Sequence, residues 1–133
     1  VRSANYTDCE ISKKYKENRI ELIDMTSGET LYKKYSKQYD AGEFWFGMTP
    51  STRDVLNEKD VNTILFVLGD FGMVECPIDT FNELINNAKT TFKKDNVTIK
   101  HYHICISPPP DVKLFKTKKT TVFDFNSTFT IFD

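Results

Sequence analysis

The sequence predicts an α+β (or α/β) fold: a mixed sheet of about five strands, one well-defined amphipathic helix packed on it, and one or two shorter helices. Three observations predict this fold. An apolar run of strand length spans Thr63–Gly72, apolar residues recur at helical spacing through 79–94, and a second apolar run spans Val97–Ile106. A strand, a helix and a strand in this order indicate a mixed core.

Length and composition indicate a single domain over residues 1–133. The hydrophobic content of 39% and the aromatic content of 14% suit a globular chain. Residues 44–133 carry the clear element signals and form the predicted core, whereas residues 1–43 form an N-terminal segment of uncertain structure. The 18 basic and 19 acidic residues nearly balance, which argues against nucleic acid as a partner. No apolar run approaches the ~20 residues of a membrane-spanning helix, so we expect no membrane span.

The N-terminal segment contains one hairpin signal. Residues 19–25 alternate in part between apolar and polar side chains, and Gly28 follows in a polar turn sequence. This predicts a strand before Gly28. The segment after it stays open between strand and helix, because Tyr32, Tyr35 and Tyr39 lie at helical spacing.

A short aromatic strand and a helix entry follow. Residues 43–48 are rich in aromatic side chains, which favour strands. Thr49 then suits the N-cap of a helix and Pro50 its first position, where the missing N–H of proline costs nothing. The predicted short helix runs through Val55 and Leu56.

The helix predicted over 79–94 is the best-specified element. Asp79 or Thr80 can cap its start, and Glu83 completes a Thr-x-x-Glu capping box. Its apolar stripe should pack against the sheet; the stripe consists of Phe81, Leu84, Ile85, Ala88 and Phe92.

The C-terminal part predicts a hairpin. Three prolines at 108–110 end the preceding strand, since proline cannot donate to a sheet ladder. Residues 111–116 and 120–132 then form the two strands around a turn at 117–119. The last strand alternates, and we expect one face of it to be buried, namely Phe123, Phe125, Phe129 and Ile131.

Three Asn-x-Ser/Thr sequons point to the secretory pathway. They begin at Asn5, Asn96 and Asn126, and about one or two would arise by chance. All three positions can carry a sugar without entering the predicted core. The chain begins at Val1 without a signal sequence, as in a processed or excised segment. We therefore expect a secreted or cell-surface glycoprotein.

The three cysteines allow one disulfide and one free thiol. Cys9, Cys76 and Cys105 can pair in three ways, and the sequence does not choose among them. Cys76 is also a candidate nucleophile, because it precedes the start of a predicted helix, where the helix dipole lowers a thiol pKa. A disulfide partner or an inert buried thiol is the commoner role for such a cysteine.

The middle of the chain resembles the thioredoxin fold, over about residues 44–125. The pair Asp70-Phe71 matches the end of that family's central strand, and the motif position is filled by Cys76-Pro77-Ile78-Asp79. The segment Pro110–Lys116 is similar to the family's cis-proline segment and the strand after it. The resemblance implies a thioredoxin-like topology with Cys76 as a single thiol, because an aspartate replaces the second cysteine. One helix of the family has no counterpart here.

The only two histidines form a candidate metal pair. His101, His103 and Cys105 alternate along one strand, so they should share a face at a spacing of about 6.5 Å. Imidazole and thiolate are ligands that zinc prefers. The commoner explanation is the less buried face of an ordinary strand, so we expect no metal and no cofactor.

No complete catalytic motif is present, which favours a non-enzymatic protein. Trp45, with Phe44 and Tyr39 near it, is a candidate aromatic patch for a partner. The leading hypothesis is a secreted or cell-surface domain that binds a protein partner, with a strand edge that also allows a homodimer. The alternatives are a thioredoxin-like protein that uses Cys76 as a single thiol, and a small-ligand carrier with an aromatic pocket.

Overall fold

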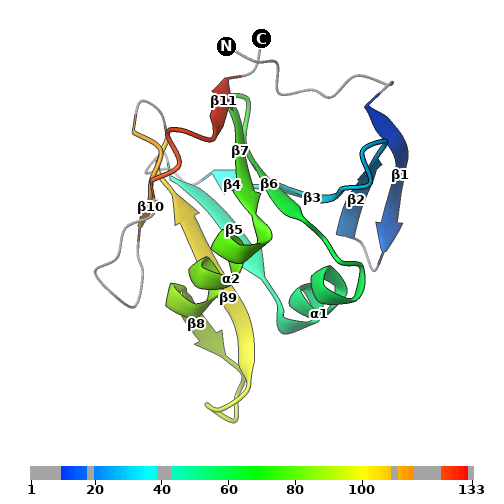
Figure 1. The fold of residues 1–133 in the computed structure, drawn as a ribbon. Helices are drawn as coiled ribbons and strands as arrows, with labels where there is room; N and C mark the ends of the chain where they lie inside the picture. Colours follow the sequence, from blue (N-terminus) through cyan, green and yellow to red (C-terminus); the bar gives the residue numbers. More distant parts are fainter. Residues whose placement is uncertain (1–9, 18–19, 39–42, 109–110, 116–123, 132–133) are drawn as a thin grey trace.

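The computed structural model describes residues 10–17, 20–38, 43–108, 111–115 and 124–131. In these residues the chain forms strands β1 to β11 and helices α1 and α2, which confirms the α+β class (Figure 1). The strands belong to two sheets and not to one sheet of about five strands as predicted.

The larger sheet is mixed and has six strands in the order β1-β2-β3-β6-β7-β11. Strands β3 and β6 pair in parallel, and every other neighbouring pair is antiparallel. Strand β6 is buried on both faces, as expected for a central strand with a continuous apolar sequence. The bounds are β1 Ile11–Glu17, β2 Ile20–Met25, β3 Thr30–Tyr35, β6 Thr63–Leu68, β7 Gly72–Pro77 and β11 Phe129–Ile131.

The second sheet has five strands, all antiparallel to their neighbours. Its order is β10-β9-β5-β4, and β8 pairs with β9 further along the same strand. Strand β9 therefore holds the sheet together, because β5, β8 and β10 all pair with it. The bounds are β4 Lys37–Gln38, β5 Phe44–Met48, β8 Lys89–Phe92, β9 Ile99–Ile106 and β10 Leu114–Phe115.

Helix α1 (Pro50–Glu58) begins as the sequence predicts. The Thr49 hydroxyl accepts a hydrogen bond from the Thr52 amide at 3.2 Å, and Pro50 takes the first helical position. Val55 and Leu56 are buried. Among the described residues, no helix has the length and apolarity needed to cross a membrane.

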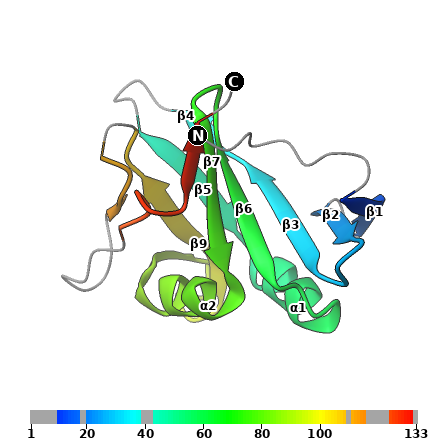
Figure 2. The same cartoon turned by 45° about the horizontal axis from the view of Figure 1, so that its top comes forward.

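The main core lies between the two sheets and is closed at one end by α1 and α2 (Figure 2). Aromatic rings connect its layers. Phe66 of β6 lies edge-on to Phe46 of β5 with ring centroids 4.8 Å apart, and Phe81 of α2 lies 6.4 Å from Phe66. The opposite face of the larger sheet carries a smaller buried cluster, formed by Ile23, Leu31, Leu65, Val67 and Met73.

Helix α2 (Ile78–Asn87) is shorter than the predicted 79–94 and starts one residue earlier. Its buried stripe contains Phe81, Leu84 and Ile85, as expected. The backbone becomes extended at Ala88, however, and the next residues join β9 as strand β8. Phe92 is 48% exposed and is not part of the stripe. The β-branched Thr90 and Thr91 favour the strand, and its ladder to β9 overrides the helical period.

The predicted capping box is also wrong. Pro77 occupies the N-cap of α2, with no side-chain cap bond, so Thr80 and Glu83 already lie inside the helix. Pro77 still fits a helix entry, because its fixed φ angle and missing N–H are tolerated there.

The apolar run at Thr63–Gly72 is not one strand. Strand β6 ends at Leu68, Gly69 adopts a φ of +51°, and the Phe71 amide donates to the Leu68 carbonyl at 3.0 Å. The chain then returns as β7, which the sequence did not predict. The two apolar runs on either side of α2, β6 and β9, consequently lie in different sheets.

The strand predicted before Gly28 is confirmed, and it belongs to a hairpin. Strands β2 and β3 pair on either side of Gly28, whose φ of +96° suits glycine. The segment after Gly28 is a strand as far as Tyr35, which settles the open alternative over the described part. Tyr32 and Tyr35 point to opposite faces, so Tyr32 is buried and Tyr35 is exposed. Tyr39 lies outside the described residues.

The C-terminal hairpin forms only in part. An isolated antiparallel bridge joins Lys113 to Asp124, but β10 pairs with β9 and β11 pairs with β7. A turn at 126–128 breaks the predicted long strand. As a result Phe125 is buried, whereas Ile131 is 52% exposed, so the predicted common buried face is wrong. Phe123 lies outside the described residues.

Candidate functional site

The outward surface of the five-stranded sheet brings together residues that the sequence marked separately. The register pairs Trp45 with Cys105 and Gly47 with His103. Since alternate residues point to opposite faces, Phe44 and Phe46 enter the core, whereas Trp45 and the two histidines point outward. We call this surface the outer face and define it by Trp45, Gly47, Thr91, His101 and His103.

Trp45 is held in one orientation on the outer face. Its indole Nε1 donates a hydrogen bond to Nδ1 of His103 at 2.9 Å, and the two ring centroids lie 5.6 Å apart. The indole also covers Gly47, where an added Cβ would lie 2.5 Å from Trp45 Cη2. The missing side chain at position 47 therefore provides the seat for the indole.

Both ring nitrogens of His103 are engaged. Nε2 is hydrogen-bonded to the hydroxyl of Thr91 on β8. Because Nδ1 accepts from Trp45, the ring proton lies on Nε2 and the imidazole is neutral. Burial lowers the pKa of His103, and the nearby His101, with ring centroids 6.4 Å apart, lowers it further. The three strands β5, β8 and β9 are thus joined by one line of side-chain hydrogen bonds.

The predicted metal ligand His103 takes part in this hydrogen-bond network, and both of its ring nitrogens are occupied. A metal ion on His103 would have to displace either Trp45 or Thr91. Within the part of the chain that the structure describes, no group of three or more His, Cys, Asp or Glu side chains is placed to hold a metal. Cys105, which lies opposite Trp45 in the register of β5 against β9, is buried.

Acidification should destabilise the fold through His103. An unfolded chain has the ordinary histidine pKa of about 6.5, and the folded pKa lies below it. The unfolded state then binds more protons between the two values, so the free energy of unfolding falls as the pH falls. The stabilisation is complete above about pH 6.5 and is lost as the pH drops through the folded-state pKa.

Urea unfolding, followed between about pH 7.5 and 5 around this pKa, measures the effect. The His103→Gln variant keeps a polar group but cannot titrate, so its stability should vary less over this range. Trp45 is the only tryptophan, and its fluorescence should change as its acceptor is protonated. Parallel pH profiles for the wild type and the variant would contradict a neutral, hydrogen-bonded ring.

Of the two aromatic candidates that the structure describes, Trp45 points outward and Phe44 does not. Phe44 is 0% exposed and packs edge-on against Phe71 at 5.7 Å, so it belongs to the core and not to a surface patch. Tyr39 lies outside the described residues. Phe44 and Trp45 cannot form one surface patch, because neighbouring residues on a strand point to opposite faces.

Cys76 has the environment of an inert thiol. It is 0% exposed on β7, two residues before α2 begins, and burial raises its pKa to about 12. Its thiol donates weakly to the Pro77 carbonyl, with 3.7 Å between the two atoms. A thiolate nucleophile needs the opposite shift. Within the described residues no disulfide joins Cys76 to Cys105, and Cys9 lies outside them.

The residues that carry the thioredoxin resemblance are now placed. Asp70 and Phe71 lie in the turn between β6 and β7, and Cys76 follows on the second strand of that hairpin. A complete strand thus separates the Asp-Phe pair from the helix. The resemblance stays a hypothesis about topology.

The two described sequons differ in how their amide groups are bound. The Asn126 Nδ2 atom donates to Asp124 at 2.7 Å and to Asp111 at 3.0 Å, and its Oδ1 accepts from the Val112 amide at 3.0 Å. Asn96 is exposed in the turn between β8 and β9, with a φ of +59°. Asn5 lies outside the described residues.

After secretory expression, we expect a glycan on Asn96 and none on Asn126. A sugar on the Asn126 amide nitrogen would remove one of its two donors and crowd two carboxylates. Mass spectrometry of each site after enzymatic deglycosylation in heavy water measures the occupancy. A folded protein with full occupancy at Asn126 would contradict the hydrogen-bonded turn.

Sequence reasoning missed Gly47 and Thr91 as parts of the site. Gly47 carried no signal of its own, because its role depends on the neighbouring indole. Thr91 was assigned to a helix, and only its place on β8 brings it opposite His101 and next to His103.

Comparisons of the chain with protein-family models, with curated proteins and with solved structures give no match.

Proposed function

We propose that the protein is a secreted or cell-surface non-enzymatic domain that binds a protein partner through the outer face. One observation carries the proposal: Trp45 is fixed on an outward sheet surface by His103 and by the seat at Gly47. Tryptophan is enriched among the residues that dominate interface energetics. A side chain that is already ordered loses less conformational entropy on binding.

The β8–β9 hairpin extends this surface. Among the described strands β8 pairs only with β9, so its other edge is open to an added strand. Two apolar side chains near it are exposed, Phe92 at 48% and Val97 at 78%. In Figure 1 the hairpin projects beyond the helices at the bottom of the view. A partner that pairs with β8 would also reach the apolar tip.

The groups with catalytic potential are better explained as structural. Cys76 is buried with a raised pKa, and His103 uses both ring nitrogens to hold neighbouring strands. Neither group is ready to attack or to accept a proton from a substrate. This supports a binding role over an enzymatic one, and it also weighs against the single-thiol alternative.

Affinity capture from extracellular fluid tests the proposal. The immobilised wild-type protein should enrich a partner, and Trp45→Ala should lose it. Gly47→Ala should lose it as well, because its new Cβ pushes the indole from its seat. Phe71→Ala is the matched control, since Phe71 is an exposed aromatic residue (47%) in the β6–β7 turn of the other sheet.

The possible results distinguish binding through the outer face from binding elsewhere and from self-association. Retention of the partner by Trp45→Ala, or equal loss with Phe71→Ala, would contradict binding through the outer face. Sedimentation of the purified protein identifies the case in which the partner is a second copy. In that case Trp45→Ala should shift the dimer to a monomer.

A further inference from the structure

The orientation of Trp45 on the outer face depends on one titratable group. The indole Nε1 donates to Nδ1 of His103 at 2.9 Å, and it can do so only while that nitrogen carries no proton. A protonated imidazole has an N–H group on both ring nitrogens and accepts no hydrogen bond. The bond that fixes Trp45 therefore exists only while His103 is neutral.

The described neighbours of His103 on the outer face include no carboxylate. Its own strand contributes a second imidazole and a buried thiol, β8 contributes an ammonium group and a hydroxyl, and β5 contributes only uncharged groups. These neighbours are His101 and Cys105 on β9, Lys89 and Thr91 on β8, and Trp45 and Gly47 on β5. A proton added to His103 would therefore meet no compensating negative charge from them.

His101 influences the pH at which His103 gains its proton. Burial lowers the pKa of His103, and the charge of the nearby His101 lowers that pKa further, with 6.4 Å between the ring centroids. Like charges at this distance disfavour each other, so the two imidazoles resist being protonated together. Histidine is also the side chain whose ordinary pKa allows a change of charge between about pH 5 and 8. His103 is thus neutral at neutral pH and becomes charged only in acid.

We propose that protonation of His103 releases Trp45 from its fixed orientation and thereby switches off partner binding by the outer face. This inference rests on the proposed role of the outer face as a binding surface. Once Nδ1 carries a proton, Nδ1 and the indole Nε1 are two donors that face each other, so the pair must separate. The indole then loses the bond that holds it over Gly47. A partner must reorder it at an entropic cost, so the complex forms at neutral pH and dissociates in acid.

The release of Trp45 is tested first on the free protein, without any partner. NMR spectra recorded between about pH 7.5 and 5 follow the imidazole signals and the indole Nε1–H signal. The chain has two histidines and one tryptophan, so these signals are few. The indole signal should move with the titration of His103, and acrylamide should quench the fluorescence of Trp45 more strongly in the acidic form.

Two results of this titration would overturn the proposal. The first is an indole signal that stays unchanged while His103 titrates, because the two groups would then be independent. The second is cooperative unfolding in step with the titration, seen by far-ultraviolet circular dichroism, because the release of Trp45 would then not be a local event.

Elution of a captured partner tests the consequence for binding. Partner held by the immobilised wild-type protein at neutral pH should elute as the pH is lowered. Because only the neutral fraction of the protein binds, the apparent dissociation constant should rise about tenfold per pH unit below the NMR midpoint of His103. A partner that stays bound well below this midpoint would overturn the proposal.

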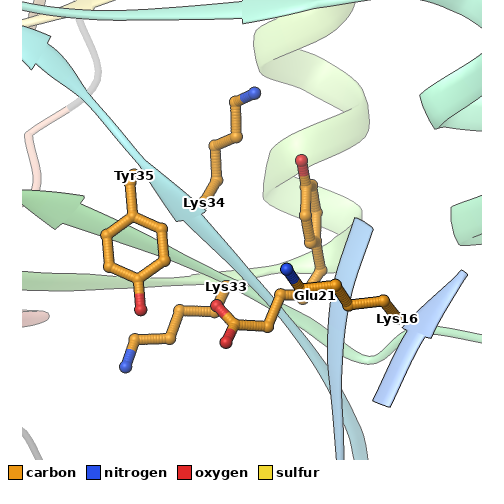
Figure 3. Close-up of a pocket in the computed structure, with 6 residues that line it drawn as sticks. Lys16, Glu21, Lys33, Lys34 and Tyr35 are labelled. Carbon is orange, nitrogen blue, oxygen red and sulfur yellow. The ribbon is translucent and has the colours of Figure 1, made fainter. Parts of the chain in front are cut away.

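Three variants connect the elution to His103. His103→Asn keeps an acceptor oxygen near the position of Nδ1 but cannot titrate, so it should hold the partner at both ends of the pH range. His101→Gln removes the neighbouring charge, so its elution midpoint should move to higher pH. Glu21→Gln is the matched control, because it removes a titratable carboxylate from the larger sheet, where Glu21 lies between Lys16 and Lys33 of the adjacent strands (Figure 3). Its midpoint should equal that of the wild type.

The results separate a failure of this inference from a failure of the proposed function. Elution from His103→Asn at the wild-type pH would overturn the inference and leave binding through Trp45 intact. If His103→Asn does not bind at neutral pH, the His101→Gln midpoint decides: an upward shift supports the inference, and an unchanged midpoint overturns it. An indole that follows His103 while no partner binds at any pH would overturn the proposed function, and the regulation of binding with it.

Discussion

Replacement of Phe66 by alanine should lower the free energy of unfolding by about 3–5 kcal/mol. Phe66 is 0% exposed and lies at the junction of the three parts of the core. It packs on Phe46 of the second sheet and on Phe81 of α2. The cavity left by its removal cannot close without moving a sheet. Small domains are stable by only about 5–15 kcal/mol, so the variant should be near its unfolding threshold.

Phe92→Ala is the matched control and should cost no more than about 1 kcal/mol, within the range of surface changes. Phe92 lies on β8 and is 48% exposed. Urea unfolding of both variants, followed by circular dichroism, gives the comparison. If Phe92→Ala costs as much as Phe66→Ala, Phe92 belongs to a buried helical stripe and α2 extends to 94.

The sequence predicted the elements whose signals are local. Aromatic side chains identified the strand Phe44–Met48. The Thr49-Pro50 pair identified the start of α1, because a cap depends on neighbouring residues alone. Gly28 identified the β2–β3 turn for the same reason: its positive φ favours glycine. These predictions needed no knowledge of distant contacts.

The division of the strands into two sheets could not be predicted from local sequence patterns. The turn at Gly69 splits one apolar run into two strands, and nothing in the run itself marks its pairing partner. The end of α2 failed for a related reason. Phe92 follows Ala88 at helical spacing, so the period continues across the point where the chain changes to a strand. Residues 89–92 form a strand because they pair with β9 across the turn at 93–98. The helical prediction ran into this turn and did not anticipate the pairing.

The candidate site shows the same limit. Trp45 and His103 were each recognisable by residue type, but their contact requires the register of β5 against β9. Gly47 has a role only because that register brings the indole over it.

Substitution of Gly72 by alanine should detach β11 from the larger sheet. An added Cβ would collide with the Thr130 carbonyl oxygen and would lie 2.7 Å from the Phe129 ring. Strand backbone cannot rotate away as a flexible side chain can, so β11 itself must move. We expect a loss of about 1–3 kcal/mol, towards the upper end of overpacking costs. Hydrogen exchange should show loss of protection at the paired amides of β7 and β11.

Gly28→Ala is the control for this prediction. Gly28 has a φ of +96° and no atom within 4 Å of an added Cβ, so its cost arises from backbone conformation alone. Both variants should therefore be less stable, but only Gly72→Ala should expose the β7–β11 ladder. Full protection of that ladder in Gly72→Ala would mean that β11 does not approach Gly72 as closely as the pairing of Gly72 with Ile131 requires. The closing strand of the larger sheet would then have to be placed differently.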